Sequence, residues 1–437
     1  MDAIYASVAE VERRRGVKVD LLVICGDFQG LRTEDDYEAL AVPPKYRAMN
    51  SFADYYSGKK VAPVLTILVG GNHEASNFLG ALHYGGWVAP GMYYLGAAGC
   101  VRFGGVRIAG MSGIFNRGHY DMARYEMRAE RLDARDAIRS VYHYRELDVF
   151  RLSQLTGECG VMVSHDWPRG IERFGNTEKL LKQKPFFREE VERNDLGSPA
   201  HELLLSTLAP RHWFAAHLHV KFSAVVPHPP IEGQPRATRF LALDKCLPRR
   251  DFLQLVLVER PEGSDEAPTL QYDAEWLAIL RGTHSLSGDA PPPARERPPA
   301  SHDRVSPADV EAARLLAAAR CGDSLCIPHD FEPAHAAAGG RRRANPLRES
   351  NPQTDRFLGM LRLEHRVTVP HRAAPPPPPP LDDPAAIMLD DEDDLPVASV
   401  DPAAILLDDD DMDDAAPAPP AAANAMADPA AIDIDDD

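Results

Sequence analysis

The sequence predicts an α/β fold with a largely interior sheet over residues 1–230. Five apolar runs in this part of the chain have the length of strands, and each ends in glycine or polar residues. Segments of helical character separate several of these runs. Uninterrupted apolar strands that alternate with helices are typical of a sheet covered on both faces, because both faces of such strands must be buried.

The strand-like runs can be placed in order along the chain. They are VDLLVICGDF at 19–28, APVLTILVGGNH at 62–73, GVRIAGMSGIF at 105–115, CGVMVSHDWP at 159–168 and HWFAAHLHVKF at 212–222. A helix is predicted at 46–58, where YRAMNSFADYYSG closes with glycine, the residue favoured just past a helix end.

A smaller C-terminal domain is predicted over 235–372, with Pro- and Ala-rich insertions. FLALDKCLPRRDFLQLVLVE at 240–259 has strand character, and LQYDAEWLAILRGT at 270–283 has helix character. PPPARERPP at 291–299 indicates a linker or insertion. A further helix is expected at 307–320, and ordered sequence returns at 351–365.

Residues 373–437 are predicted to be a disordered tail, because this Pro-, Ala- and Asp-rich segment offers too little apolar surface to fold alone. The chain carries a net charge of −18, yet 19 Asp and Glu residues lie after residue 381 and no Lys or Arg follows Arg372, so residues 1–372 carry +1. The body can therefore bind a polyanion. Asp-Pro-Ala-Ala-Ile recurs at Asp383, Asp401 and Asp428, either as docking peptides for a protein partner or as low-complexity drift.

The composition excludes several classes of protein. No apolar run approaches the roughly 18–20 residues of a membrane span, and the N-terminal residues lack the pattern of a secretory signal. The six cysteines have no framework spacing, which suits a reducing compartment. We therefore expect no membrane partner, and the sequence leaves the oligomeric state open.

Four of the strand-like runs end in side chains that bind divalent cations. These ends are Gly26-Asp27, Gly71-Asn72-His73-Glu74, Ser164-His165-Asp166 and His217-Leu218-His219. Ligands of α/β sheets bind beyond the carboxyl ends of the strands, and Asp, Asn and His can all hold a metal ion. Two residues that are two positions apart in an extended segment face the same side, so we expect both histidines of the last motif to reach one metal pair. His73 stands beside the amide of Asn72 as a candidate proton carrier.

Each motif also has an ordinary interpretation. Gly-Asp after a strand is usually a turn, Asn-His-Glu can begin a helix, and a single histidine can lie in the core or on the surface. Their succession on consecutive strand ends favours one shared site.

These blocks resemble the calcineurin-like metallophosphoesterases, and longer segments are similar to the RNA lariat debranching enzymes within that superfamily. The similar segments cover residues 1 to about 285, with an echo at 351–354. They include VDLLVICGDFQ, VPPKYR, GGNHEASN, GGWVAPGMYYLG, SHDWPRGI, LGSPA, WFAAHLHVKF and FLALDKCLPRRDFLQ. The resemblance implies a sandwich of two mixed sheets flanked by helices, with two divalent metal ions.

The resemblance also implies a role for each matching residue. Asp27 would bridge the two metals, and His219 would help to hold the first. Asn72, His165 and His217 would hold the second, and His73 would be the catalytic histidine. The ligand types suit iron, zinc or manganese.

Residues 112–145 match the family's lariat-recognition loop. Arg124, Arg128, Arg131, Arg135 and Arg139 have helical spacing and would form one basic stripe, with Tyr142 among the tyrosines that could stack on bases. Interspersed acidic residues leave a salt-bridged solvent helix as the alternative. We expect Arg124, Arg128, Arg131 and Tyr142 to contact RNA.

The family pattern begins with a strand that ends in Cys-x-His and gives two ligands to the first metal. This chain has no such motif, and Met1 to Tyr5 align with the helix that follows it. The first metal then keeps Asp27 and His219. We expect translation to start further upstream; a short form with a weakened site is the alternative.

The function implied is hydrolysis of the 2′–5′ phosphodiester at the branch point of excised intron lariat RNA, in the nucleus. Two alternatives remain at this stage: another metallophosphoesterase with a phosphoprotein or nucleotide substrate, or a catalytically impaired scaffold.

Overall fold

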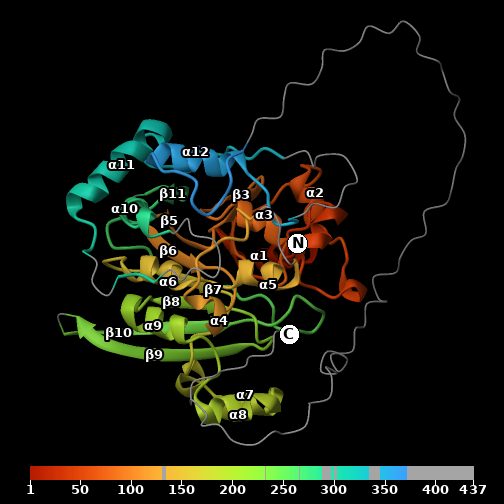
Figure 1. Ribbon diagram of the computed structural model, residues 1–437. Coiled ribbons are helices and arrows are strands. Elements are labelled where there is room, and N and C mark those ends of the chain that lie inside the picture. The colour runs from red at the N-terminus through yellow and green to blue at the C-terminus, as the bar shows by residue number, and fades with distance from the viewer. Residues whose placement is uncertain are drawn as a thin grey trace, which may run out of the picture. The chain divides into compact units, whose positions relative to one another are not determined.

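Two mixed sheets form the centre of the structure. The computed structural model describes residues 1–129, 134–231, 233–264, 266–287, 297–299, 303–333 and 345–371 (Figure 1). One sheet has four strands in the order β1-β2-β4-β3, and the other has seven in the order β11-β5-β6-β7-β8-β10-β9. Each sheet contains parallel and antiparallel pairs. The predicted α/β sandwich of two mixed sheets flanked by helices is confirmed.

The strands are short in the first sheet and longer at the far edge of the second. Their bounds are β1 Leu22–Cys25, β2 Thr66–Val69, β3 Gly86–Ala89, β4 Met92–Tyr94, β5 Ala98–Phe103, β6 Val106–Met111, β7 Val161–Ser164, β8 His212–Ala215, β9 Phe222–Ile231, β10 Gln234–Ala242 and β11 Leu270–Tyr272. Each of the five predicted runs contains a strand, namely β1, β2, β6, β7 or β8.

The helices are mostly short. Their bounds are α1 Asp2–Arg15, α2 Phe52–Tyr56, α3 Ser76–Ala81, α4 Arg117–Tyr120, α5 Ala134–Tyr142, α6 Glu146–Ser153, α7 Thr177–Gln183, α8 Arg188–Arg193, α9 Pro199–Leu208, α10 Ala274–Gly282, α11 Pro307–Cys321 and α12 Pro352–Leu361. Five of the described helices begin with an N-cap asparagine or serine whose side chain accepts a backbone N–H, at Asn116, Asn176, Ser198, Ser306 and Asn351.

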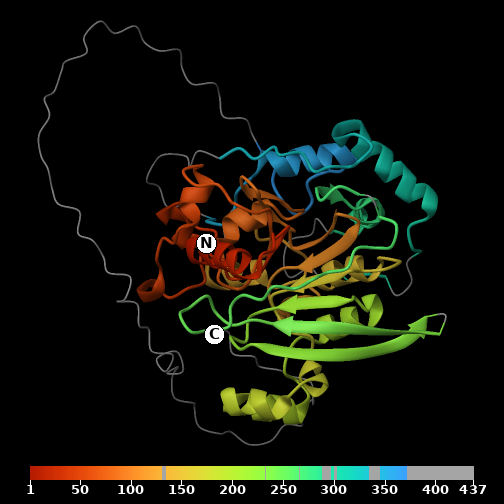
Figure 2. The same ribbon diagram turned by 180° about the vertical axis from the view of Figure 1, so that it is seen from behind.

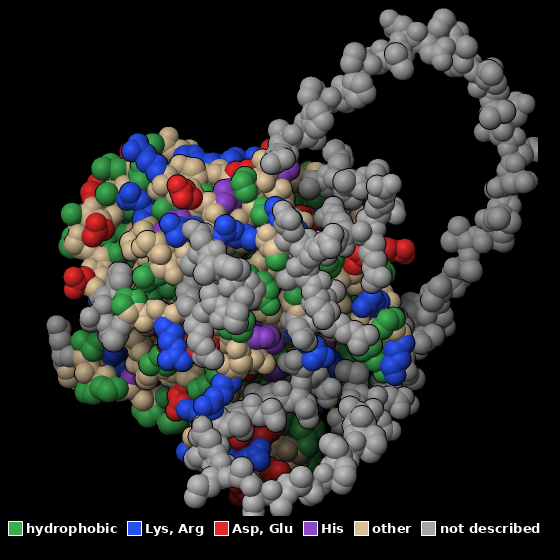
Figure 3. Space-filling view, in the orientation of Figure 1, with side chains coloured by type: hydrophobic (Ala, Val, Ile, Leu, Met, Phe, Trp, Pro, Cys, Tyr) green, Lys and Arg blue, Asp and Glu red, His purple; other side chains and the backbone are tan. Residues whose placement is uncertain are grey.

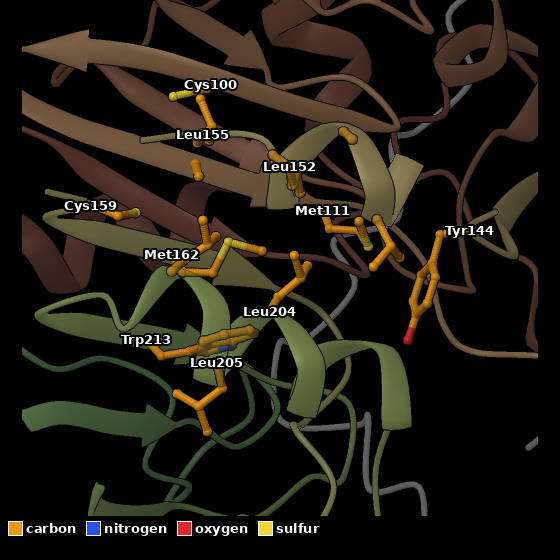
Figure 4. Packing of buried hydrophobic residues seen from close by; sticks show 14 of the residues in the cluster. Cys100, Met111, Tyr144, Leu152, Leu155, Cys159, Met162, Leu204, Leu205 and Trp213 are labelled. Carbon is orange, nitrogen blue, oxygen red and sulfur yellow. The ribbon is translucent and has the colours of Figure 1, made fainter. Parts of the chain in front are cut away.

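Apolar side chains fill three layers of the sandwich. Ile67 and Val69 of β2 meet Ile108 and Val163 between the two sheets. A second cluster joins the outer face of the four-stranded sheet to α1, α2 and α3. The largest cluster packs the seven-stranded sheet against α6, α9 and α10 (Figures 1 and 2). This largest cluster includes Met162, Leu204, Leu205 and Trp213, whose side chains lie together in Figure 4.

Residues from Gln234 onward complete the seven-stranded sheet. β10 pairs with β8 in parallel, and β11 pairs with β5. Met1–His371 form one compact unit, so the boundary expected near residue 235 falls inside it. The predicted tail at 373–437 and most of the predicted linker at 291–299 lie outside the described residues.

Two predicted elements are wrong in extent. Residues 251–259 form no strand although their composition suits one, and Leu257 in this segment is 87% exposed. The helix predicted at 46–58 is reduced to α2, because residues 47–50 have no regular structure.

β1 lies at an edge of the four-stranded sheet, where β2 is its neighbour.

Within the described part of the chain, no helix has the length and apolar character that crossing a membrane requires.

Candidate metal centre

The loops after β1 and β2 approach each other so closely that glycine is required. Gly26 follows β1 with a φ of 102°, and a Cβ there would lie 2.3 Å from Nδ1 of His165. A Cβ on Gly71 would lie 2.0 Å from Oδ1 of Asp27. Any side chain at either position would therefore push apart the residues that meet here.

Asp27, Asn72 and His165 converge from three strand ends. Nε2 of His165 lies 3.1 Å from Oδ1 of Asn72 and 3.4 Å from Oδ1 of Asp27. On the other side of the ring, Nδ1 lies 2.7 Å from the carbonyl oxygen of Cys25, and since a carbonyl can only accept, Nδ1 carries the proton. Nε2 is thus the nitrogen that faces the two oxygen ligands, as in a metal-binding histidine held from behind.

The electrostatics of this point favour positive charge. Burial disfavours the charged form of His165, but the neighbouring Asp27 outweighs it and raises the pKa of His165 to about 9. Burial would raise the pKa of Asp27, yet His165 and His73 hold it well below its usual range. A carboxylate, an amide oxygen and an imidazole nitrogen around one centre fit a divalent cation such as manganese, iron or zinc.

His217 lies beside His165, and the extended segment expected for His217 and His219 from the sequence is wrong. The segment after β8 is a bend and not an extended strand, with φ of 60° at His217 and 49° at His219. The rings of His165 and His217 have centroids 5.0 Å apart. Burial and the charge of Lys245 lower the pKa of His219 to about 3, with Asp27 also close enough to act on it. His219 is therefore neutral at pH 7 and can offer a lone pair.

Among the residues that the structure describes, no group of three or more His, Cys, Asp and Glu side chains is arranged to hold a metal ion. The tight group is Asp27 with His165, and the amide of Asn72 is its third member. His217 and His219 stand around this group.

His73 is held at the rim of the centre. Its backbone N–H donates to Oδ1 of Asp27 at 3.0 Å, and Nδ2 of Asn72 lies 3.3 Å from its Nε2. Nδ1 is buried and has no hydrogen-bond partner among the described residues. One ring nitrogen is thus held beside a candidate ligand, and the other is enclosed without a hydrogen bond among the described residues.

Glu74 joins the two ligand loops, a role that sequence reasoning did not assign. Its carboxylate accepts the backbone N–H groups of Phe28 at 3.0 Å, Gly30 at 3.3 Å and Gly71 at 3.2 Å. Burial, with the nearby charge of Asp27, raises the pKa of Glu74 to about 8. The block Gly-Asn-His-Glu contains this residue, but nothing in the local sequence indicates that its partners follow β1.

The predicted basic stripe is not one helix. Residues 122–129 form turns and irregular structure, and α5 begins at Ala134. Arg131 lies outside the described residues. On the face shown in Figure 3, the coloured Lys and Arg side chains are scattered among Asp and Glu and do not gather into a stripe.

The other three predicted RNA contacts occupy different surroundings. The Arg124 side chain is 10% exposed and donates to Oδ2 of Asp148 at 2.7 Å and to the Val141 carbonyl at 3.1 Å. Tyr142 is buried, and Arg128 donates to the carbonyl of Arg366 at 2.9 Å. Contact with RNA stays a prediction for these residues, whereas the anchoring of the loop by Arg124 is observed.

Known proteins share this organisation. Residues 2–221 match the calcineurin-like phosphoesterase family, and residues 235–366 match the C-terminal domain of lariat debranching enzyme.

Curated relatives described as lariat debranching enzyme are similar over most of this chain. The chain is 47% identical to the one from Danio rerio over 375 residues, which is 83% of this chain and 64% of the relative. It is 53% identical to the one from Homo sapiens over 293 residues, or 65% and 52% of the two chains. The match to the one from Drosophila pseudoobscura pseudoobscura has 40% identity and covers 83% and 74%. The matched region thus spans less than two thirds of the Danio rerio and Homo sapiens proteins.

Proposed function

The chain belongs to the calcineurin-like phosphoesterases and, within them, to the lariat debranching enzymes, and from this premise we propose that it hydrolyses the 2′–5′ phosphodiester at the branch point of excised intron lariat RNA. The observation that carries the proposal is the meeting of Asp27, Asn72 and His165 at one point, with His73 beside them. Such a reaction follows splicing, so we also propose that the protein works in the nucleus.

The donor set supports binding of two divalent metal ions of the iron, zinc or manganese type. Asp27 would help to hold both ions, Asn72, His165 and His217 would hold one, and His219 would help to hold the other. When bound, such ions supply positive charge at the phosphate and lower the pKa of water to about 7.

The chain's own residues contribute positioning and proton transfer. Glu74 keeps the loops of Asp27 and Asn72 in register through three backbone N–H groups. His73 donates a proton to the leaving 2′ oxygen, which would otherwise depart as a poorly stabilised alkoxide. Histidine suits this role because its ordinary pKa lies near neutral pH.

The substrate assignment is tested with four compounds and the purified chain. A synthetic RNA with one 2′–5′ branch is compared with a linear RNA of the same sequence, a phosphopeptide and a nucleotide monophosphate, each with Mn²⁺, Fe²⁺ or Zn²⁺. We expect cleavage of the 2′–5′ bond alone. Faster turnover of the phosphopeptide or the nucleotide would instead assign the chain to another phosphoesterase class.

A further inference from the structure

The segment Asn345–Ser350 is here called the C-terminal strap. It contacts the loop 121–129, which precedes α5, and residues that follow the loops carrying Asp27 and His73. Leu347 at its middle is fully buried. It packs in one small apolar cluster with Met127 of that loop, Ile138 of α5 and Ala81 of α3. The strap therefore packs against α3 and against the 121–129 loop with α5, all of which lie far from it in the sequence.

One end of the strap holds backbone carbonyls of the loop 121–129. Nδ2 of Asn345 donates to the carbonyls of Glu126 at 2.8 Å and Ala129 at 2.7 Å. Nη1 of Arg348 donates to the carbonyl of Arg128 at 2.7 Å. Three of the last four carbonyls before residue 130 thus accept hydrogen bonds from the strap.

The loop has little regular structure of its own. Between residues 122 and 129 the structure has a turn, in which the N–H groups of Arg128 and Ala129 donate to the Tyr125 carbonyl and the N–H of Tyr125 donates to the Glu126 carboxylate. The side chain of Glu126 is fixed from the opposite side by Arg145 and Ser140. The strap therefore adds three hydrogen bonds to the backbone of a loop that is otherwise held through the side chains of Arg124 and Glu126.

Glu349 of the strap bonds to residues that follow the loops carrying Asp27 and His73. The carboxylate of Glu349 pairs with Arg32, five residues after Asp27, and accepts from Nδ2 of Asn77 at 3.1 Å, four residues after His73. Arg32 also pairs with Asp36 at 2.7 Å, and that carboxylate accepts from Asn77 at 2.8 Å. Glu349 is thus part of one closed network with both loops.

We propose that the C-terminal strap is a positioning element for the substrate, which sets the place of the 121–129 loop relative to the metal centre, and that Asn345 is its principal loop-side residue. The inference rests on the proposed function. It requires that the strap act on the binding of a large branched substrate and not on the chemical step, because its loop-side contacts reach no candidate metal ligand. A substrate too small to reach the loop should be insensitive to it.

The test separates substrate binding from chemistry. Asn345→Asp is nearly isosteric but aims a carboxylate at two carbonyls, so we expect the KM for branched RNA to rise about tenfold with kcat changed less than twofold. Hydrolysis of bis(p-nitrophenyl) phosphate should stay within twofold of the wild type. Amide hydrogen exchange should quicken at 125–129 and stay unchanged in β7 and α9.

Two further variants guard against unfolding and non-specific effects. Arg348→Ala removes one exposed side chain that holds the same loop, so it should raise KM about threefold without loss of fold. Asn176→Ala, which removes the N-cap of the distant helix α7, is the matched control and should change neither KM nor loop exchange.

Unchanged KM and unchanged loop exchange in both strap variants would overturn the inference, and so would an equal loss of activity on the small diester. Should the wild-type chain itself show no preference for branched RNA, the proposed function fails, and exchange at 125–129 alone then decides whether the strap positions the loop.

Discussion

Oδ1 of Asp27 lies 3.4 Å from Nε2 of His165, so residues that follow strands of two different sheets meet across the sandwich. Asp27 follows β1 of the four-stranded sheet, and His165 follows β7 of the seven-stranded sheet. The contact exists only when both sheets are correctly packed. The candidate metal centre is therefore also a point where the two halves of the sandwich are joined.

The Asp27–His165 pair predicts a pH-dependent stability of the metal-free chain. The pKa of His165 is about 9, above its ordinary value near 6.5, so the pair contributes stability that is complete below pH 6.5 and is lost as the pH rises towards 9. The loss should be on the order of 3 kcal/mol. Urea denaturation in EDTA between pH 6 and 9.5 measures it. In Asp27→Asn the dependence over this range should largely disappear; persistence of the full slope would exclude the pair as its source.

His73→Ala should keep the metals and lose the activity. His73 lies beside Asn72 but is no predicted ligand, so metal content measured by elemental analysis should match the wild type. The rate of branched-RNA cleavage should fall by about 10²–10⁴, the usual contribution of a general acid. A variant with normal turnover would show that the leaving oxygen takes its proton elsewhere.

Glu74→Ala should weaken the fold and the metal centre together. Three backbone N–H groups at Phe28, Gly30 and Gly71 lose their acceptor, which should cost about 3 kcal/mol of unfolding free energy. Because these groups position Asp27 and Asn72, metal affinity should also fall, by about tenfold or more. Isothermal titration with Mn²⁺ and chemical denaturation measure the two effects. Metal affinity equal to that of the wild type would mean that the loops keep their register without Glu74.

Arg124→Ala distinguishes an anchor from an RNA contact. Removing this buried partner leaves Asp148 as an uncompensated charge, so the unfolding free energy should fall by about 3 kcal/mol. If Arg124 bound a phosphate, the slope of log affinity for RNA against log salt would shrink by about one in the variant. Because the Arg124 guanidinium is already paired with Asp148, we expect no change in that slope, contrary to the RNA contact predicted from the sequence. Arg128→Ala, at a neighbouring position of the same loop, is the comparison.

The layered fold, and the meeting of Asp27, Asn72 and His165, could be predicted from the sequence because both depend on local pattern. Apolar runs such as 62–73 and 159–168 identify interior strands, and the polar residues that follow them identify the edge where ligands gather. The composition of residues 251–259 predicted a strand, but the structure has none there. Strand formation depends on a hydrogen-bonding neighbour, and a local pattern carries no information about one.

By itself the sequence determined which side chains follow which strands, and so the prediction that Asp27, Asn72, His73, His165, His217 and His219 belong to one site. Only the tertiary structure decided what those residues touch. It buried Arg124 against Asp148, turned Glu74 towards the loop after β1, and brought Asn345 and Glu349 onto loops more than two hundred residues away. Such contacts arise from the packing of whole sheets and segments, whose relative positions no periodicity within a single segment encodes.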